Sequence, residues 1–332
     1  MERILTGDRP TGPLHLGHYV GSIENRIELQ NKYECFFIIA DLQVLTDHLE
    51  NSPQIKENIY ELMADYLALG LKQSNCFFVQ SCIPELVELT NLFTYFVSVS
   101  RVNRNPTVKT EAKVYGVSQI SVGFQNYPIS QSADILGFKP SVIPVGKDQL
   151  PHIELTREIA KSFNTKFKKK LFETPRALLS ETPSLIGTDG KNKMSKSLGN
   201  AIFFKDSKEV VRKKIMTMYT DPSRLHPTDP GDPDKNPVFI YHRIFNPNRD
   251  EVLDLESRYR SGLVGDVEVK EKLYVAISNF IDPIRDRREE FIKDKSIINN
   301  ILRVGNARAR EVVKDTLDDV KKAVSLNYEF SD

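Results

Sequence analysis

Short apolar runs that alternate with helix-like patterns are the feature that most constrains how this chain folds. Residues 35–40 read Cys-Phe-Phe-Ile-Ile-Ala, and such an unbroken apolar run is typical of a strand buried on both faces. Residues 57–71 instead repeat their apolar side chains at the spacing of an amphipathic helix. Because strands that alternate with helices are joined by crossovers, this order predicts a parallel sheet with helices on both of its faces.

The same alternation continues as far as residue 163. It predicts further strands at 3–6, 76–80 and 141–145, and further helices at 17–31, from Pro84 onward and at 150–163. The expected fold class is therefore α/β, with a Rossmann-like doubly wound parallel sheet. Ligands of such sheets bind at the carboxyl ends of the strands, where we expect the functional site.

A second, helical region follows the alternating part of the chain. Residues 221–237 contain five prolines among Asp and Gly, which indicates a turn-rich connection, and clear helical patterns follow at 269–281 and 306–326. A chain of 332 residues is long enough for two domains. We place the first at 1–205 and a helical C-terminal domain at 206–332.

The overall charge says little about partners. Lys and Arg number 46 and Asp and Glu number 45, which leaves a net charge of +1. Attraction to phosphates depends on where the cations lie rather than on their sum. The basic runs at 166–170 and 212–214 are candidate patches, although a solvated face is the more common explanation of such runs.

The cysteines and the N-terminus indicate the compartment. Cys35, Cys76 and Cys82 lie in apolar stretches, and an odd number without tight pairing predicts free buried thiols in a reducing environment. The N-terminus has no apolar leader, and no apolar run reaches the length of a membrane span. We therefore expect a cytoplasmic protein with no membrane segment.

The first candidate motif is Pro-Thr-Gly-Pro-Leu-His-Leu-Gly-His at 10–18, between the first predicted strand and a helix. Its glycines allow a ligand to approach the backbone, and the helix presents free N–H groups to an anion. His15 and His18 lie one turn apart and can donate to phosphate oxygens. The alternatives are two surface histidines, or a metal site that has no third ligand at a recognisable spacing.

The second candidate motif is Lys-Met-Ser-Lys-Ser at 193–197, within a polar loop at 182–200. Two lysines three residues apart, with hydroxyls beside them, suit a loop that closes over a phosphate chain, because phosphoryl chemistry depends on well-placed cations. For such a sequence taken alone, a solvated turn is the more common explanation.

The third candidate is one face of a helix at 127–136. Tyr127, Gln131 and Asp134 are spaced at i, i+4 and i+7, so their side chains share a face. A desolvated carboxylate is a natural partner for a ring such as indole, which has one N–H donor and no acceptor. The alternative is a partly buried Asp that pairs with a lysine or caps a turn.

The first two motifs together resemble the signatures of class I aminoacyl-tRNA synthetases, and the second matches letter for letter. More specifically, the blocks at 7–12, 19–21, 127–136, 145–149 and 152–157 resemble those of bacterial tryptophanyl-tRNA synthetases. The resemblance covers essentially the whole chain.

The resemblance implies two sets of ligand-binding residues. Around tryptophan would lie Asp134, which would bind the indole N–H, with Tyr127, Gln131, Gln149, Gly7, Asp41 and Gln43. ATP would contact Arg9, Pro10, Thr11, Gly17, His18, Gly146, Lys147, Asp148, Leu185, Lys193, Met194, Ser195, Lys196 and Ser197. The catalytic residues would be His15, His18, Lys193 and Lys196, with Mg²⁺ on the phosphates and no metal ligands from protein side chains.

The resemblance also implies the reaction and its partners. The chain would activate L-tryptophan with ATP and transfer it to the 2′-hydroxyl of tRNA(Trp), as a homodimer. Residues 1–205 would be the catalytic domain, including the lysine loop, and 206–332 would bind the tRNA anticodon.

The sequence departs from the family pattern at three positions. Gln131 stands where Met is frequent, Lys147 where Glu is usual, and Gln43 where His is frequent. The Lys147 side chain is therefore a doubtful ribose ligand. A further phosphate ligand is Lys109 or Lys113.

Two other functions stay open. Tyrosyl-tRNA synthetases also carry Tyr-x-x-x-Gln-x-x-Asp on this helix, but usually pair the Asp with a tyrosine at the position of Leu5. An apolar Leu5 favours indole over phenol. A catalytically silent paralogue that binds nucleotide or RNA is the second alternative.

Overall fold

The computed structural model describes residues 2–46, 49–115, 121–179, 184–222, 224 and 226–328. Its centre is a five-stranded parallel sheet with the order β3-β2-β1-β4-β5. The strands are β1 (Arg3–Asp8), β2 (Glu34–Ile39), β3 (Cys76–Val79), β4 (Val142–Val145) and β5 (Arg176–Leu179). The α/β fold class is confirmed, and β5 is a strand that the sequence did not predict.

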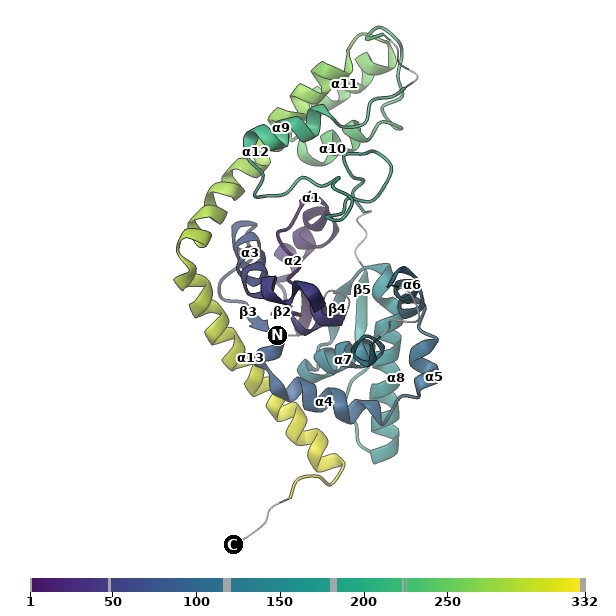
Figure 1. Ribbon diagram of the computed structural model, residues 1–332, viewed down its shortest axis with the longest axis vertical. Helices are drawn as coiled ribbons and strands as arrows, with labels where there is room; N and C mark the ends of the chain where they lie inside the picture. Colours follow the sequence, from purple (N-terminus) through teal and green to yellow (C-terminus); the bar gives the residue numbers. More distant parts are fainter. Residues whose placement is uncertain are drawn as a thin grey trace.

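Helices cover both faces of this sheet (Figure 1). The side chains of β2 divide the core, because Phe37 and Ile39 pack on one face and Phe36 and Ile38 on the other. An unbroken apolar run is what a strand covered on both sides requires. The first face is covered by α1 (Leu16–His18), α2 (Glu24–Leu29) and α3 (Ile55–Ala68), and the second by α4 (Pro84–Thr94), α7 (Val122–Phe138) and α8 (Leu150–Phe167).

The helix predicted at 17–31 is not a regular α-helix. Between α1 and α2 the chain makes a π-helical turn, η1 (Tyr19–Ile23). A π turn takes an extra residue and changes which side chains face a neighbour, which apolar spacing alone does not reveal. Two short helices, α5 (Val99–Asn103) and α6 (Pro106–Tyr115), precede α7.

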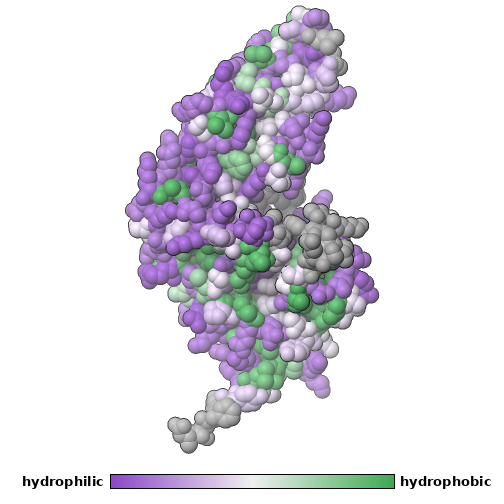
Figure 2. All heavy atoms as spheres, viewed as in Figure 1, coloured by the Kyte–Doolittle hydropathy of each residue, from purple (hydrophilic) through white to green (hydrophobic). Residues whose placement is uncertain are grey.

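The C-terminal region is helical, as predicted. It contains α9 (Lys208–Met216), α10 (Pro237–Phe245), α11 (Arg249–Arg260), α12 (Asp266–Lys293) and α13 (Lys295–Ala323). α9 to α12 gather at one end of the molecule, whose visible surface is mostly hydrophilic (Figures 1 and 2). The boundary after residue 205 stays a prediction. α12 runs from this end to α3, where its Arg288 donates to Asp65, and α13 then packs on β3, α4 and α7 of the sheet domain.

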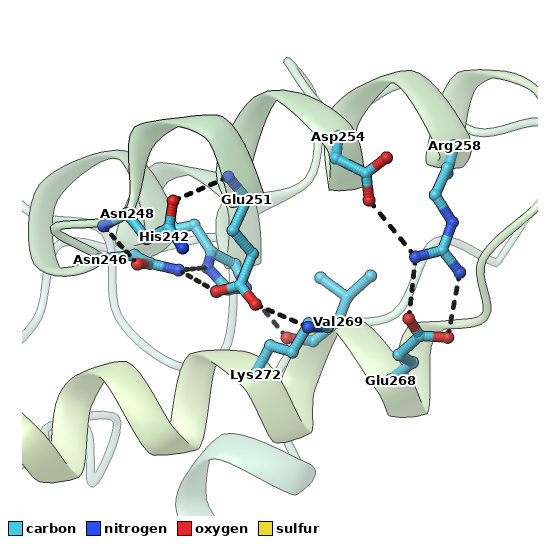
Figure 3. A network of polar contacts seen from close by, with 9 residues as sticks. All are labelled: His242, Asn246, Asn248, Glu251, Asp254, Arg258, Glu268, Val269 and Lys272. Atoms are coloured by element: carbon cyan, nitrogen blue, oxygen red, sulfur yellow. Dashed lines mark hydrogen bonds and ion pairs between the residues drawn. The ribbon is translucent and has the colours of Figure 1, made fainter.

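Polar contacts tie α10, α11 and α12 together (Figure 3). The Nε2 atom of buried His242 lies 2.9 Å from the carbonyl oxygen of Val269, so this nitrogen carries the proton and donates. Glu251 accepts hydrogen bonds from Lys272 at 2.6 Å and from the side-chain amide of Asn246 at 3.0 Å. These contacts fix three helices of the C-terminal region to one another.

α13 protects the edge of the sheet. β3 is an edge strand, and the side-chain oxygen of Asn306 accepts a hydrogen bond from the backbone N–H of Val79 at 2.8 Å. The approach is close because residue 305 is glycine: a Cβ atom there would lie 1.8 Å from the carbonyl oxygen of Phe77. The last long helix therefore covers an edge that would otherwise be open to pairing.

Two expectations about the chain can be compared with the structure. Cys35 and Cys76 are buried free thiols, but Cys82 is exposed, because it ends the turn that follows β3 instead of lying within the strand. Within the described ranges, no helix is long and apolar enough to cross a membrane.

Replacing Gly305 by alanine should lower the melting temperature and the free energy of unfolding. A helical glycine normally gains up to about 1 kcal/mol when replaced by alanine. Here the new methyl group would push α13 from β3, at a cost of about 1–3 kcal/mol or more. Gly123→Ala in α7, where the nearest atom is a side-chain oxygen 3.6 Å away, is the matched control. Thermal melts that show equal stability for the two variants would contradict this packing.

Candidate active site

A cavity of about 470 Å³ opens at the carboxyl ends of β1 and β4. The sheet order reverses at β1, with β2 on one side and β4 on the other, and such a reversal opens a crevice between diverging crossovers. The sequence-predicted residues that line this cavity are Gly7, Arg9, Gln43, Tyr127, Gln131, Asp134, Gly146, Asp148, Gln149 and Lys193.

α7 presents Tyr127, Gln131 and Asp134 to the cavity together, as their spacing predicts. Asp134 is only 5% exposed, and Leu5 and Ile135 are apolar neighbours in the lining. Burial raises the pKa of Asp134 to about 7, although a hydrogen bond from Gln80 lowers it and the charge of Asp41 raises it further. The alternative interpretation paired Asp134 with a lysine, but in the structure its carboxylate is bonded to the neutral amide of Gln80.

The hydroxyl of Tyr127 donates to a carboxylate oxygen of Glu111 at 2.7 Å. Next to it, the side-chain amide of Gln131 donates to that of Gln149 at 3.2 Å. Gln43 donates to the hydroxyl of Ser130 at 3.3 Å, so the three glutamine side chains at the cavity wall are held in place.

Asp41 lies behind the wall rather than in it. It is buried, and its two oxygens accept hydrogen bonds from the backbone N–H and the hydroxyl of Ser81, at 2.9 and 2.5 Å. It also accepts from the N–H of Leu42 at 3.0 Å. This carboxylate anchors the turns after β2 and β3, and it does not line the cavity.

The two histidines of the first motif stack, with ring centroids 3.7 Å apart. Nδ1 of His18 accepts a hydrogen bond from the backbone N–H of His15 at 3.1 Å. Burial lowers the pKa of His15 to about 2 and that of His18 to about 4. Both rings are therefore neutral near pH 7, and His18 carries its proton on Nε2, from which it can donate.

The lysine loop docks against this first motif. Nζ of Lys196 donates to the carbonyl oxygen of Gly12 at 3.0 Å and lies 3.3 Å from the hydroxyl of Thr11. The N–H of Gly17 donates to the sulfur of Met194 at 3.2 Å. Two motifs that are about 180 residues apart in the sequence thus form one surface, and Lys193 extends it to the cavity.

The remaining predicted residues lie outside the cavity lining. Lys147 and Ser197 are exposed, whereas Leu185, Met194 and Pro10 are buried. Ser195 is held by the side-chain oxygen of Asn200, which accepts from its backbone N–H at 2.8 Å. Lys109 is exposed, and the side chain of Lys113 lies outside the described residues, so the choice between them stays open.

Residues 1–282 match the family described as tRNA synthetases class I (W and Y). The chain belongs to this family. The class I resemblance drawn from the two motifs is thereby confirmed.

Individual relatives of this synthetase match along nearly its whole length. The tryptophan–tRNA ligase of Borreliella burgdorferi is 46% identical over 98% of this chain and 93% of its own length. That of Treponema pallidum is 47% identical over 98% of both chains. The tryptophanyl-tRNA synthetase of Campylobacter jejuni, crystallised with ADP and tryptophan, superposes with a TM-score of 0.87 at 29% identity, over 97% of this chain and 99% of its own.

The synthetase cavity has an ion pair, with a buried arginine, that the sequence analysis missed. Arg26 of α2 donates to Asp8 of β1 at 2.6 Å, and the hydroxyl of Tyr66 donates to the same carboxylate at 2.5 Å. Despite burial, which raises it, the Arg26 charge and these hydrogen bonds hold the pKa of Asp8 at about 2. Asp8 and Arg26 both line the cavity. Both residues lie near the first motif in the sequence, but no sequence pattern indicates that Arg26 contacts Asp8.

Gln80 is the second residue that the sequence analysis missed. It follows β3 directly, and it contacts Asp134 without lining the cavity itself. No cluster of three or more His, Cys, Asp or Glu side chains that could hold a metal occurs in the described part of this synthetase.

The rings of His15 and His18 should remain neutral from about pH 8 down to about pH 5. An ordinary histidine would become protonated within this range, because its pKa is about 6.5. Because both pKa values are lowered on folding, the unfolded state binds more protons, and stability falls as the pH drops below about 6.5. ¹³C-histidine NMR measures the ring titrations, with His15→Asn and His18→Asn variants to assign the signals. A midpoint near 6.5 for either ring would contradict the burial described above.

Proposed function

We propose that this chain activates L-tryptophan with ATP and transfers it to the 2′-hydroxyl of the terminal adenosine of tRNA(Trp). The observation that carries the proposal is Asp134, a buried carboxylate in a cavity that Arg9 and Lys193 also line. A buried acceptor suits a donor-only indole N–H, and the cations suit a triphosphate. Relatives named tryptophan–tRNA ligases, matched over 98% of this chain, support the same function.

The walls around Asp134 favour an indole ring over a phenol. Leu5, Ile38 and Ile143 line the same cavity and bring no hydrogen-bonding side chain to it. A site built to pair with one N–H rejects a ring without that group, because the buried carboxylate would lose its partner. Tyrosine is the competing substrate that the test below must exclude.

The first step joins the tryptophan carboxylate to the α-phosphorus of ATP. The carboxylate oxygen attacks in line, a new O–P bond forms, and the bond to the β-phosphate oxygen breaks to release pyrophosphate. ATP would enter as its Mg²⁺ complex, and the ion would add positive charge beside the phosphates. Nε2–H of His18 and the ammonium groups of Lys193 and Lys196 stabilise the charge that develops on the phosphates.

The second step transfers the acyl group. The 2′-hydroxyl of the tRNA attacks the tryptophanyl carbonyl carbon and an ester bond forms. AMP leaves with the bonding electrons, and the hydroxyl proton is released to solvent. Nothing in this sequence needs a covalent bond to the protein.

The lysine loop has to exchange partners during the first step. Nζ of Lys196 now contacts Gly12 and Thr11, and burial lowers its pKa. A triphosphate would offer the ammonium group negatively charged oxygens in place of these neutral ones. We therefore assign the loop a movement that transfers Lys196 from the first motif to the phosphates.

The tRNA would extend over both parts of the chain. Residues 1–205 form the catalytic domain and residues 206–332 the anticodon-binding region in this proposal. In the basic run on α9, Arg212 pairs with Glu271 and Lys214 with Asp206, and Lys213 is exposed. The run at 166–170 ends α8 on the sheet domain. The protein would act in the cytoplasm, where charged tRNA is used.

The proposed assembly is a homodimer. Exposed apolar side chains gather on adjoining helices of the sheet domain: Val87 and Tyr95 on and after α4, Val99 on α5 and Val122 on α7, with exposures of 55, 75, 67 and 82%. In Figure 2 apolar atoms are more frequent over this half than over the helical end. An exposed apolar patch is typical of a protein–protein interface.

Pyrophosphate exchange with each amino acid tests the function. We expect exchange with tryptophan. Asp134→Ala should raise the KM for tryptophan by about a hundredfold, since a buried hydrogen bond to a charged group contributes about 1.5–3 kcal/mol. Lys193→Ala should lower kcat by about a hundredfold, with the KM for tryptophan nearly unchanged. Exchange with tyrosine alone would refute the assignment, and equal loss of tryptophan affinity in both variants would refute the division of roles.

Light scattering after gel filtration tests the dimer. The unmodified chain should elute at twice the mass of one chain, and Val99→Asp should elute as a monomer, because a charge cannot be buried unpaired in an apolar interface. Leu253→Asp on α11, which is 63% exposed in the C-terminal region, is the control and should remain dimeric. A monomeric unmodified chain would contradict the proposal.

A further inference from the structure

Gln80 and Asp134 form a buried contact that the reaction described above does not use. Gln80 is 1% exposed and lies in the turn η4 (Gln80–Cys82) that follows β3. Its side-chain nitrogen Nε2 lies 2.9 Å from Oδ1 and 2.8 Å from Oδ2 of Asp134. One nitrogen thus lies within hydrogen-bonding distance of both oxygens of the carboxylate.

The orientation of this amide follows from electrostatics. An amide carries two N–H donors on nitrogen and an acceptor on oxygen. If the amide were turned round, its oxygen would face the carboxylate without an intervening hydrogen. The observed orientation directs an N–H of Gln80 at the two oxygens of Asp134 and leaves Oε1 of Gln80 buried without a partner in the described structure. The contact with the carboxylate therefore leaves the carbonyl oxygen of the Gln80 side chain without a hydrogen bond in the described structure.

We propose that Gln80 is a positioning residue for amino-acid specificity, which fixes the Asp134 carboxylate so that it offers the substrate ring an acceptor and no donor. This inference rests on the function proposed above. Gln80 acts through Asp134, because it does not itself line the cavity. The two-oxygen contact prevents the carboxylate from rotating about its terminal bond, which directs the remaining lone pairs.

The contact also explains how a phenol is disfavoured. An indole N–H only donates, whereas a phenol hydroxyl donates and also accepts. Gln80 does not line the cavity, so it brings no donor to a phenol oxygen. Leu5, across the cavity, has no donor to offer in its place.

The charges around Asp134 make its protonation sensitive to Gln80. Burial raises the pKa of Asp134, the Gln80 hydrogen bond lowers it, and Asp41 at the end of β2 raises it. His152 of α8 contacts Tyr127, which lies on α7 with Asp134. Burial lowers the pKa of His152 to about 4, so its ring stays neutral near pH 7. The other titratable groups that line the cavity are Asp8, Arg9, Arg26, Glu111, Asp148 and Lys193.

Gln80→Leu removes the donor and keeps most of the volume. We expect the KM for tryptophan in pyrophosphate exchange to rise between about tenfold and a hundredfold, as for other buried hydrogen bonds to a charged group. The KM for ATP should stay within about twofold, since the phosphate-binding motifs are untouched. Thr90→Val in α4 is the matched control, because Thr90 is also buried and its hydroxyl bonds only to the carbonyl oxygen of Leu86.

The pH profile separates positioning from a merely structural role. Asp134 accepts the ring N–H only as a carboxylate, so kcat/KM for tryptophan should fall as the pH drops through the pKa of Asp134. Without the Gln80 donor that pKa rises, and the acid limb should move upward by about one pH unit in Gln80→Leu. In Gln80→Glu two carboxylates repel each other at high pH, so kcat/KM for tryptophan should be low there. As the pH falls, the pair can share one proton, which restores a donor to Asp134, and kcat/KM should rise.

The outcomes are distinguishable. A wild-type chain that does not exchange pyrophosphate with tryptophan overturns the proposed function. Normal wild-type exchange, with the KM for tryptophan and the acid limb unchanged in Gln80→Leu, overturns the role of Gln80 alone. Parallel increases of the KM for tryptophan and for ATP, with a lowered melting temperature and an unmoved acid limb, also overturn it, because they indicate a structural defect.

Discussion

The site depends on the position of β1, which pairs in parallel with β2 on one side and with β4 on the other. Crossovers leave a central strand in opposite directions, so their first residues separate at its carboxyl end and leave a crevice. Gly7 and Asp8 end β1 at this crevice, and Gly146 and Asp148 follow β4 there. The first motif continues directly from β1, while the lysine loop and α7 reach the same cavity through Lys193 and Asp134.

Two carboxylates border the same cavity and have opposite electrostatic roles. Asp8 is paired with the Arg26 cation, which holds the pKa of the carboxyl at about 2 and fixes a permanent charge. Asp134 has only the amide of Gln80, and its pKa is about 7. A cation would have satisfied Asp134 fully, whereas an amide orients it and leaves its charge for a ligand. The two carboxylates differ because Asp8 is paired with a cation and Asp134 with a neutral amide.

Much of the site could be predicted from local sequence. The i, i+4, i+7 spacing brought Tyr127, Gln131 and Asp134 to one wall, because helical periodicity is a local property. Contacts across elements could not be predicted in this way. Asp41 was expected at the ligand but anchors Ser81, and Gln80 was overlooked because a single glutamine after a strand has no distinctive pattern. The same reason applies to Arg26 with Asp8, and to Gly305 against β3.

The strand and helix periods, the two motifs and the family follow from the order of residues alone, since they depend on neighbours along the chain. Three further features depend on tertiary packing: Lys196 contacts Gly12, both histidines are neutral, and α13 covers β3. Burial and long-range pairing determine these features, and neither is encoded at a fixed spacing. A side chain's charge and orientation are set by what packs around it, which the linear order of residues does not specify.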